Sequence, residues 1–134
     1  MTKLKATDKE KLLTDVELEL MTILWRLGEG SVNEVMAELP QERELATTSV
    51  STMLRILEQK GVVTVRKEGR GHHYVPVMQK EAFEKKALKH VVDRVFEGTP
   101  SALVRQLLNS VDLSADEIAK IKSLIANLEK GDAT

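Results

Sequence analysis

The stretch TTSVSTMLRILEQKG, residues 47–61, decides the fold, because its two faces carry different kinds of side chain. At about 100° per residue, its apolar residues gather on one side of a helix that stops at Gly61. The apolar residues are Val50, Met53, Leu54 and Leu57. The other side begins with hydroxyl side chains, although Ser and Thr are poor helix formers. The stretch predicts a helix buried on one side and hydroxyl-rich on the other.

The exposed side of this helix has chemistry that suits the reading of DNA bases. Its residues are Thr48, Ser51, Thr52, Arg55 and Gln59, with Ser49 beside them. In a major groove, hydroxyls can donate or accept hydrogen bonds, and a Thr methyl can touch a thymine methyl. Backbone N–H groups at a helix start also favour a phosphate. From this helix alone, a simpler interpretation is that Thr47 caps it and the other hydroxyls are incidental.

Two further helices are expected before this one. The first covers residues 15–27, where apolar residues recur at helical spacing, and Thr14 with Glu17 fits a capping box at its start. The second covers residues 33–39. Its cap is either Ser31 acting with Glu34 or Asn33 alone.

A β-hairpin is expected after residue 61. VVTVRKE (62–68) and HHYVPV (72–77) are rich in β-branched residues, and the two glycines between them can adopt positive φ. The densest group of basic side chains falls at the tip, with Arg66, Lys67 and Arg70. Three helices and a hairpin form the winged helix-turn-helix plan, in which the third helix enters the major groove and the hairpin lies against the backbone or minor groove. We therefore predict a mainly α fold with a small β-hairpin.

The charge distribution leaves two classes of partner open. The chain of 134 residues has a net charge of −1. Residues 8–44 hold four basic and ten acidic side chains, a net of −6, whereas residues 45–78 hold five basic and two acidic, a net of +3. A local basic segment can mark an anionic partner, and it can also be an ordinary solvated surface. The acidic segment keeps open a winged-helix module that binds proteins.

Composition excludes several other classes of function. The chain has no cysteine, which excludes disulfides and cysteine metal sites and is compatible with a reducing cytoplasm. No apolar run approaches the roughly 18 to 20 residues that a membrane span needs. No P-loop, GxSxG or HExxH motif is present, so we expect neither an enzyme nor a cofactor.

The two adjacent histidines do not form a metal site in this interpretation. His72 and His73 lie next to each other on an expected strand, so their side chains point to opposite faces. We expect no bound metal, and we place His72 near a DNA phosphate.

The residues from 79 onward form three more expected helices. So short a segment is too small for a comfortable independent core, and its apolar stripes need a partner surface, most simply a second copy of the chain. We expect a winged-helix domain over residues 1–78, with 1–10 disordered, and a dimerisation domain over 79–134. The expected interface residues are Phe83, Leu88, Val91, Val92, Val95, Phe96, Leu103, Val104, Leu107, Leu108, Ile118, Ile121, Leu124, Ile125 and Leu128.

Four stretches resemble the penicillinase-repressor family of transcriptional regulators, the BlaI/MecI/CopY type. They are LTDVELELMTILW, SVNEVMAEL, TTSVSTMLRILEQKGVV and KEGRGHHYVPV, and VFEGTPSALVRQLL looks like the family's dimerisation region. The resemblance implies a homodimer that binds double-stranded operator DNA with dyad symmetry and TACA/TGTA-like half-sites. It implies repression of transcription by occupancy.

The resemblance also assigns roles along the third helix and the hairpin. Base contacts are expected from Thr48, Ser49, Ser51 and Thr52. The resemblance implies backbone contacts from Arg55, Lys67 and Arg70, and from the residues themselves we add Thr47, Arg66 and His72 as backbone contacts. The alternative function is a protein–protein adaptor without sequence-specific DNA binding.

Two family features are missing. The chain lacks the C-terminal cysteine motif of copper-responsive members. Members released by proteolysis are cut at an Asn-Phe bond, and the bond aligned with it here is Leu107-Leu108. Cleavage by a membrane-bound sensor protease is thereby put in doubt. Proteolysis, loss of the dimer and a small effector all stay open as routes of release.

Overall fold

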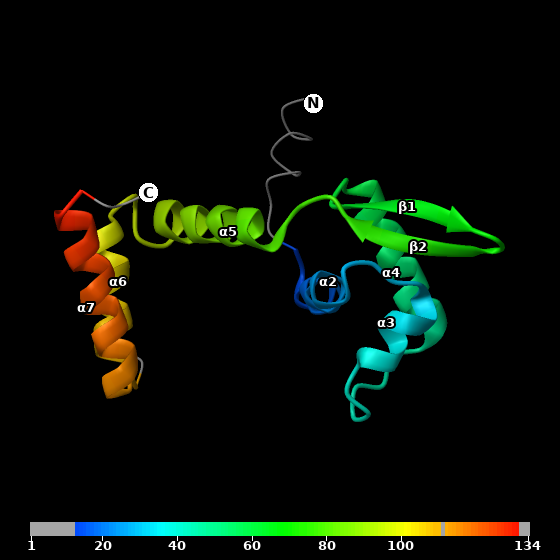
Figure 1. Ribbon diagram of the computed structural model, residues 1–134, viewed down its shortest axis with the longest axis horizontal. Helices are drawn as coiled ribbons and strands as arrows, with labels where there is room; N and C mark the ends of the chain where they lie inside the picture. Colours follow the sequence, from blue (N-terminus) through cyan, green and yellow to red (C-terminus); the bar gives the residue numbers. More distant parts are fainter. Residues whose placement is uncertain (1–12, 111, 132–134) are drawn as a thin grey trace. The chain divides into compact units, whose positions relative to one another are not determined.

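The computed structural model describes residues 13–110 and 112–131, so the expected disorder of residues 1–10 lies outside the described part. Within these described residues, three helices precede a two-stranded hairpin and three helices follow it (Figure 1). In chain order these are α2 (Asp15–Leu27), α3 (Val32–Glu38), α4 (Thr47–Gln59), β1 (Val63–Glu68), β2 (Gly71–Pro76), α5 (Lys80–Arg94), α6 (Pro100–Ser110) and α7 (Ala115–Glu129).

Capping boxes start the first two helices. Thr14 Oγ1 accepts a hydrogen bond from the Glu17 backbone N–H at 3.2 Å, and Glu17 Oε1 accepts from the Thr14 N–H at 3.0 Å. Ser31 and Glu34 repeat the arrangement at 3.2 and 2.9 Å, so the cap of α3 is Ser31 rather than Asn33. These bonds satisfy backbone donors that the first helical turn leaves without partners.

The start of α4 differs from the prediction. Ala46 occupies the N-cap position, Thr47 is the first helical residue, and no side chain of the described residues caps this helix. The prediction that Thr47 caps α4 is wrong, because the helix begins one residue earlier than that role requires. A hydroxyl at the first helical position cannot replace the N-cap side chain.

The core of the N-terminal unit is aliphatic. Its fully buried side chains are Leu20, Met21, Leu24, Val35, Val50, Leu54 and Leu57. Val62, Val63 and Tyr74 extend this core from the hairpin, while Met53 is only partly buried against it. Residues three and four apart on α4 therefore anchor the helix from one side, as its apolar pattern predicts.

The hairpin turns through two residues, Gly69 and Arg70, because Glu68 pairs with Gly71. Gly69 has a φ of 61°, a region that favours glycine. Of the two glycines that are free to adopt positive φ, Gly69 does so, whereas Gly71 belongs to β2 and does not. Helices α2 to α4 with this hairpin form the predicted winged helix-turn-helix fold.

The polypeptide after the hairpin is tied to α2. Trp25 Nε1 donates a hydrogen bond to the Met78 carbonyl at 2.9 Å, and the Trp25 and Phe83 ring centroids are 5.8 Å apart. Phe83 is buried within one chain, which corrects its assignment to the dimer surface. The chain divides into two compact units between Lys89 and His90, inside α5.

The C-terminal unit contains helices that have little core of their own. Pro100 is the first residue of α6, as expected for a residue with a preset φ. Ser114 Oγ accepts from the Glu117 N–H at 3.1 Å and caps α7. Among the described residues, neither α6 nor α7 buries a side chain. Nowhere in residues 13–110 and 112–131 is a helix long and apolar enough to span a membrane.

Candidate nucleic-acid interface

The exposed face of α4 carries most of the residues that were expected to read bases. Thr48, Ser49 and Thr52 are exposed, whereas Ser51 is half-buried. An open hollow adjoins this face, lined by Val16, Leu45, Thr48, Ser49, Thr52 and Met53. The helix therefore presents short hydroxyl side chains beside small apolar groups, a surface that allows another molecule to approach the helix closely.

Positive electrostatic potential is available at both ends of this face. Thr47 is exposed at the N-terminus of α4, where the helix dipole favours anions. Arg55 is exposed two helical turns further along. Both residues therefore offer positive potential to an anion beside the hydroxyl face of α4.

The tip of the hairpin provides a second basic group. Lys67, Arg70 and His72 are all exposed. Lys67 pairs with His72 across the hairpin, and Arg66 pairs with His73. Because side chains alternate between the faces of a strand, the two histidines point in opposite directions, as predicted.

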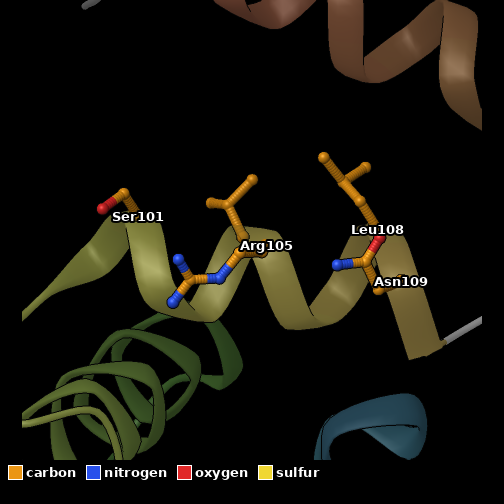
Figure 2. A pocket seen from close by; sticks show the side chains of 5 residues that line it. Ser101, Arg105, Leu108 and Asn109 are labelled. Carbon is orange, nitrogen blue, oxygen red and sulfur yellow. The ribbon is translucent and has the colours of Figure 1, made fainter.

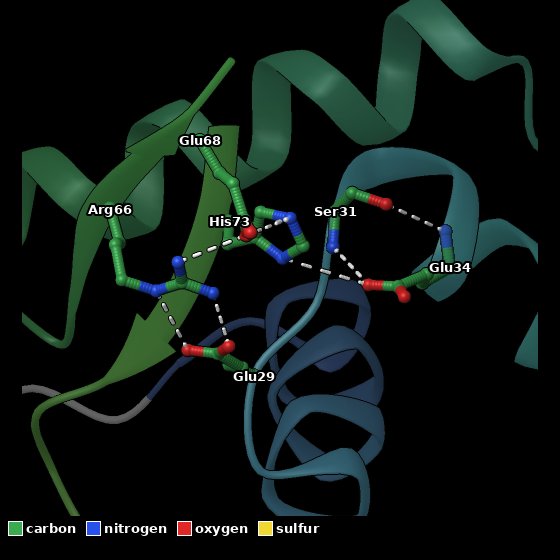
Figure 3. A network of polar contacts seen from close by, with 6 residues as sticks. All are labelled: Glu29, Ser31, Glu34, Arg66, Glu68 and His73. Atoms are coloured by element: carbon green, nitrogen blue, oxygen red, sulfur yellow. Dashed lines mark hydrogen bonds and ion pairs between the residues drawn. The ribbon is translucent and has the colours of Figure 1, made fainter. Parts of the chain in front are cut away.

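Arg66 lies at the middle of the hairpin and already has partners. Its Nε is 3.3 Å from Glu29 Oε1, its Nη2 donates to Glu29 Oε2, and its Nη1 is 3.0 Å from Glu68 Oε1 (Figure 3). The hydrogen bond from Arg66 lowers the pKa of Glu29, and the same contact raises the pKa of Arg66. Arg66 lies two residues before the end of β1, whereas Lys67 and Arg70 lie closer to the turn.

His73 lies beside the same carboxylates. Its Nε2 is 3.4 Å from Glu68 Oε1, and its Nδ1 is 3.8 Å from Glu34 Oε1, beyond hydrogen-bond distance (Figure 3). Nδ1 is buried and makes no hydrogen bond to any described residue. Within the described residues, no group of three or more His, Asp or Glu side chains could hold a metal ion.

An ion pair between an exposed lysine and a buried glutamate connects the end of α4 to the start of α2. Lys60 Nζ lies 2.7 Å from Glu17 Oε1, and the Glu17 side chain is only 5% exposed. Burial raises the pKa of Glu17, but the hydrogen bonds from Lys60 and Thr14 outweigh burial, so the pKa lies below its ordinary value. The ionised carboxylate therefore holds the end of α4 against α2.

The C-terminal helices expose apolar side chains. Figure 2 shows Ser101, Arg105, Leu108 and Asn109 along one side of α6, where they line an open hollow together with Val104. The exposed large apolar residues among those expected at the interface are Leu88, Val95, Val104, Leu107, Leu108, Ile118, Leu124, Ile125 and Leu128. Val91, Val92, Phe96, Leu103 and Ile121 are half-buried. Apolar exposure on this scale is typical of a surface that binds another protein.

Comparison with known proteins identifies the family. A family model described as "Penicillinase repressor" matches residues 13–127, which span both units. The chain belongs to the penicillinase repressor family. Membership of this family of repressors agrees with the resemblance carried by the four sequence stretches.

Individual members of the penicillinase repressor family are distant in sequence. The methicillin resistance regulatory protein MecI of Mammaliicoccus sciuri is 24% identical over 84% of this chain and 92% of its own length. The penicillinase repressor of Bacillus licheniformis is 28% identical over 84% of this chain and 88% of its own. The solution structure of the DNA binding domain of the repressor BlaI is 33% identical, covers 52% of this chain and 85% of its own, and has a TM-score of 0.47.

Sequence reasoning missed the contacts that join the hairpin to the α2–α3 turn. Gly30 pairs with Tyr74 through two backbone hydrogen bonds of 2.8 and 3.1 Å. A Cβ at Gly30 would lie 3.3 Å from Leu27 Cδ1, so a glycine suits this crowded position. The presence of a second glycine, Gly30, only two residues after Gly28 is the one sequence signal from which the close approach of the two backbones could have been inferred. Nothing local marks Glu29 as the partner of Arg66.

Proposed function

We propose that this chain is a sequence-specific DNA-binding transcriptional repressor that acts as a homodimer on a dyad operator. The observation that carries the proposal is the exposed hydroxyl face of α4, with Arg55 further along the helix, together with exposed basic residues at the hairpin tip. Membership of the penicillinase repressor family supports it.

Each part of the surface receives a role in this proposal. The residues that contact bases are Thr48, Ser49, Ser51 and Thr52. The residues that contact phosphates are Thr47, Arg55, Lys67, Arg70 and His72. Hydroxyls and methyls on α4 select bases, while the cations hold the duplex in register without reading its sequence.

The exposed apolar surface of the C-terminal helices supports the dimer in this proposal. A second copy that covers α6 and α7 would remove side chains such as Leu124, which is 65% exposed, from water. Two copies related by a twofold axis present two α4 helices to two half-sites, which we expect to be TACA/TGTA-like. The second half-site contact is then intramolecular, and the bound dimer blocks transcription by occupancy, in the cytoplasm.

The protein–protein adaptor remains a weaker candidate. Its support was the acidic balance of residues 8–44, a net of −6. Four of those carboxylates already pair with cations of the same chain, in Glu17–Lys60, Glu19–Arg43, Glu29–Arg66 and Glu38–Arg26. Part of the acidic charge thus serves the fold itself, and it needs no basic protein partner.

Footprinting on the promoter regions of the protein's own gene and its neighbours tests the proposal. We expect a protected dyad whose affinity falls steeply with salt, because phosphate contacts release counterions. Thr52→Ala should change the preferred bases, whereas Arg70→Ala should weaken binding to all sequences alike. The absence of any protected dyad at low salt would refute the proposal.

A further inference from the structure

The hairpin is attached to the α2–α3 turn at two neighbouring points. Gly30 forms a short antiparallel bridge with Tyr74 of β2, through backbone hydrogen bonds in both directions. The residue before it, Glu29, receives two N–H groups of the Arg66 guanidinium (Figure 3). A two-pronged contact between a guanidinium and a carboxylate restricts orientation as well as distance.

These attachments act on different parts of the hairpin. The Gly30 bridge holds the backbone of β2, whereas Glu29 holds a side chain of β1. Arg66 also contacts Glu68, which stands two residues further towards the tip on the same strand. Buried Val63 and Tyr74 anchor the base of the hairpin, and the Arg66 contact adds an attachment on β1 that lies closer to the tip.

The local charges argue against Arg66 as a phosphate contact. The carboxylates of Glu29, Glu34 and Glu68 surround the Arg66 and His73 side chains at the distances given above. A phosphate that approached Arg66 would meet the negative charges of Glu29 and Glu68 at the same time. Lys67 and Arg70 are exposed and lie closer to the tip. Among the described residues, the carboxylates of Glu29 and Glu68 form ion pairs with Arg66 and not with Lys67 or Arg70.

We infer that Glu29 and Arg66 are positioning residues, which set the direction of the hairpin so that Lys67 and Arg70 reach the DNA backbone. Arg66 then acts through Glu29 and not by touching phosphate, in contrast to the role expected from the sequence. The inference rests on the proposed DNA-binding function and adds to it the part of the fold that aims the hairpin.

The positioning role predicts an effect of Glu29 on DNA binding that is opposite in sign to the effect of its charge alone. Glu29→Gln removes a negative charge from a DNA-binding surface, which by itself strengthens binding to a polyanion. If Glu29 is a positioning residue, Glu29→Gln should instead weaken DNA binding, because the hairpin loses the contact that sets its direction. Because both side chains are nearly half exposed, we expect a loss of about two- to fivefold, the worth of an exposed ion pair.

Fluorescence anisotropy on the footprinted operator duplex, measured across a salt series, tests the inference with the full chain. Glu29→Gln, Arg66→Gln and the double variant should weaken binding to the same extent, and all should keep the slope of log affinity against log salt. Arg66→Lys should retain part of the affinity. The matched control is Arg70→Gln, which should reduce the magnitude of that negative slope by about 0.9, as expected for one lost phosphate contact.

The outcomes separate the two proposals. Tighter binding by Glu29→Gln, or a flatter salt slope for Arg66→Gln, would overturn the positioning role while leaving the DNA-binding function intact. A native chain that binds no duplex would overturn the proposed function itself. Each variant is folded if its Trp25 fluorescence spectrum is identical to that of the native chain. Trp25 reports on the N-terminal unit because it is the only tryptophan and lies in that unit.

Discussion

Replacing Lys60 with Met tests the ion pair that ties the end of α4 to the start of α2. Lys60 Nζ is 2.7 Å from Glu17 Oε1, and the side chains are 39% and 5% exposed respectively. Met keeps an unbranched apolar stem of similar length but removes the ammonium. The buried carboxylate is then left with the Thr14 N–H, which donates to it at 3.0 Å.

The magnitude follows from the different exposure of the two partners. Breaking a fully buried pair costs about 3–5 kcal/mol, whereas a fully exposed pair is worth about 0–1 kcal/mol. Water can replace the ammonium at the exposed end of Lys60, so we expect Lys60→Met to lower the free energy of unfolding by about 1–2 kcal/mol. Glu17→Gln removes the same attraction, and the double variant should therefore lose about 1 kcal/mol less than the sum of the singles.

The pH dependence of the free energy of unfolding provides a second test of the Glu17–Lys60 ion pair. The pKa of Glu17 is lowered on folding, because the bonds from Lys60 and Thr14 outweigh burial. A lowered pKa contributes stability above the unfolded-state value, and this stability is lost as the pH falls through the folded-state value. The difference between the native chain and Lys60→Met should therefore be present at neutral pH and shrink as the pH falls below the ordinary pKa of a glutamate and through the lowered pKa of Glu17.

Urea unfolding followed by Trp25 fluorescence measures both effects, since the only tryptophan lies on α2, in the unit that contains the ion pair. Lys85→Met, at an exposed position on α5, is the control for the substitution itself and should leave the urea midpoint unchanged. A midpoint that Lys60→Met does not lower, or a loss that is equal at neutral and acidic pH, would refute the reasoning.

Two further changes test the core and the C-terminal surface. Leu54→Ala empties a fully buried position on α4 and should cost about 3–4 kcal/mol in urea unfolding, against a small effect of Ser49→Ala on the exposed face of the same helix. Leu124→Glu places a charge on the exposed apolar surface of α7, and should convert the proposed dimer to a monomer in sedimentation velocity and weaken binding to the proposed operator. Lys122→Glu on the same helix is the charge control, and a dimer that persists in Leu124→Glu would contradict the assigned interface.

The elements that depend on neighbouring residues were predictable from the sequence. The capping boxes at Thr14 and Ser31 involve partners three residues apart, and the structure contains both. The buried side of α4 followed from helical spacing, and Val50, Leu54 and Leu57 are fully buried. The cap of α4 was not predictable in this way, because a shift of one residue moves Thr47 from a capping to a helical position.

By itself, the sequence determined which segments form helices and strands and which face of α4 is buried, since hydrophobic period and capping are local properties. Only the tertiary structure decided which charges are available to a partner. Arg66 meets Glu29 and Lys60 meets Glu17 across 37 and 43 residues of chain. Such pairs form only when packing of α2, α4 and the hairpin brings distant residues within hydrogen-bond distance, and no local pattern records that approach.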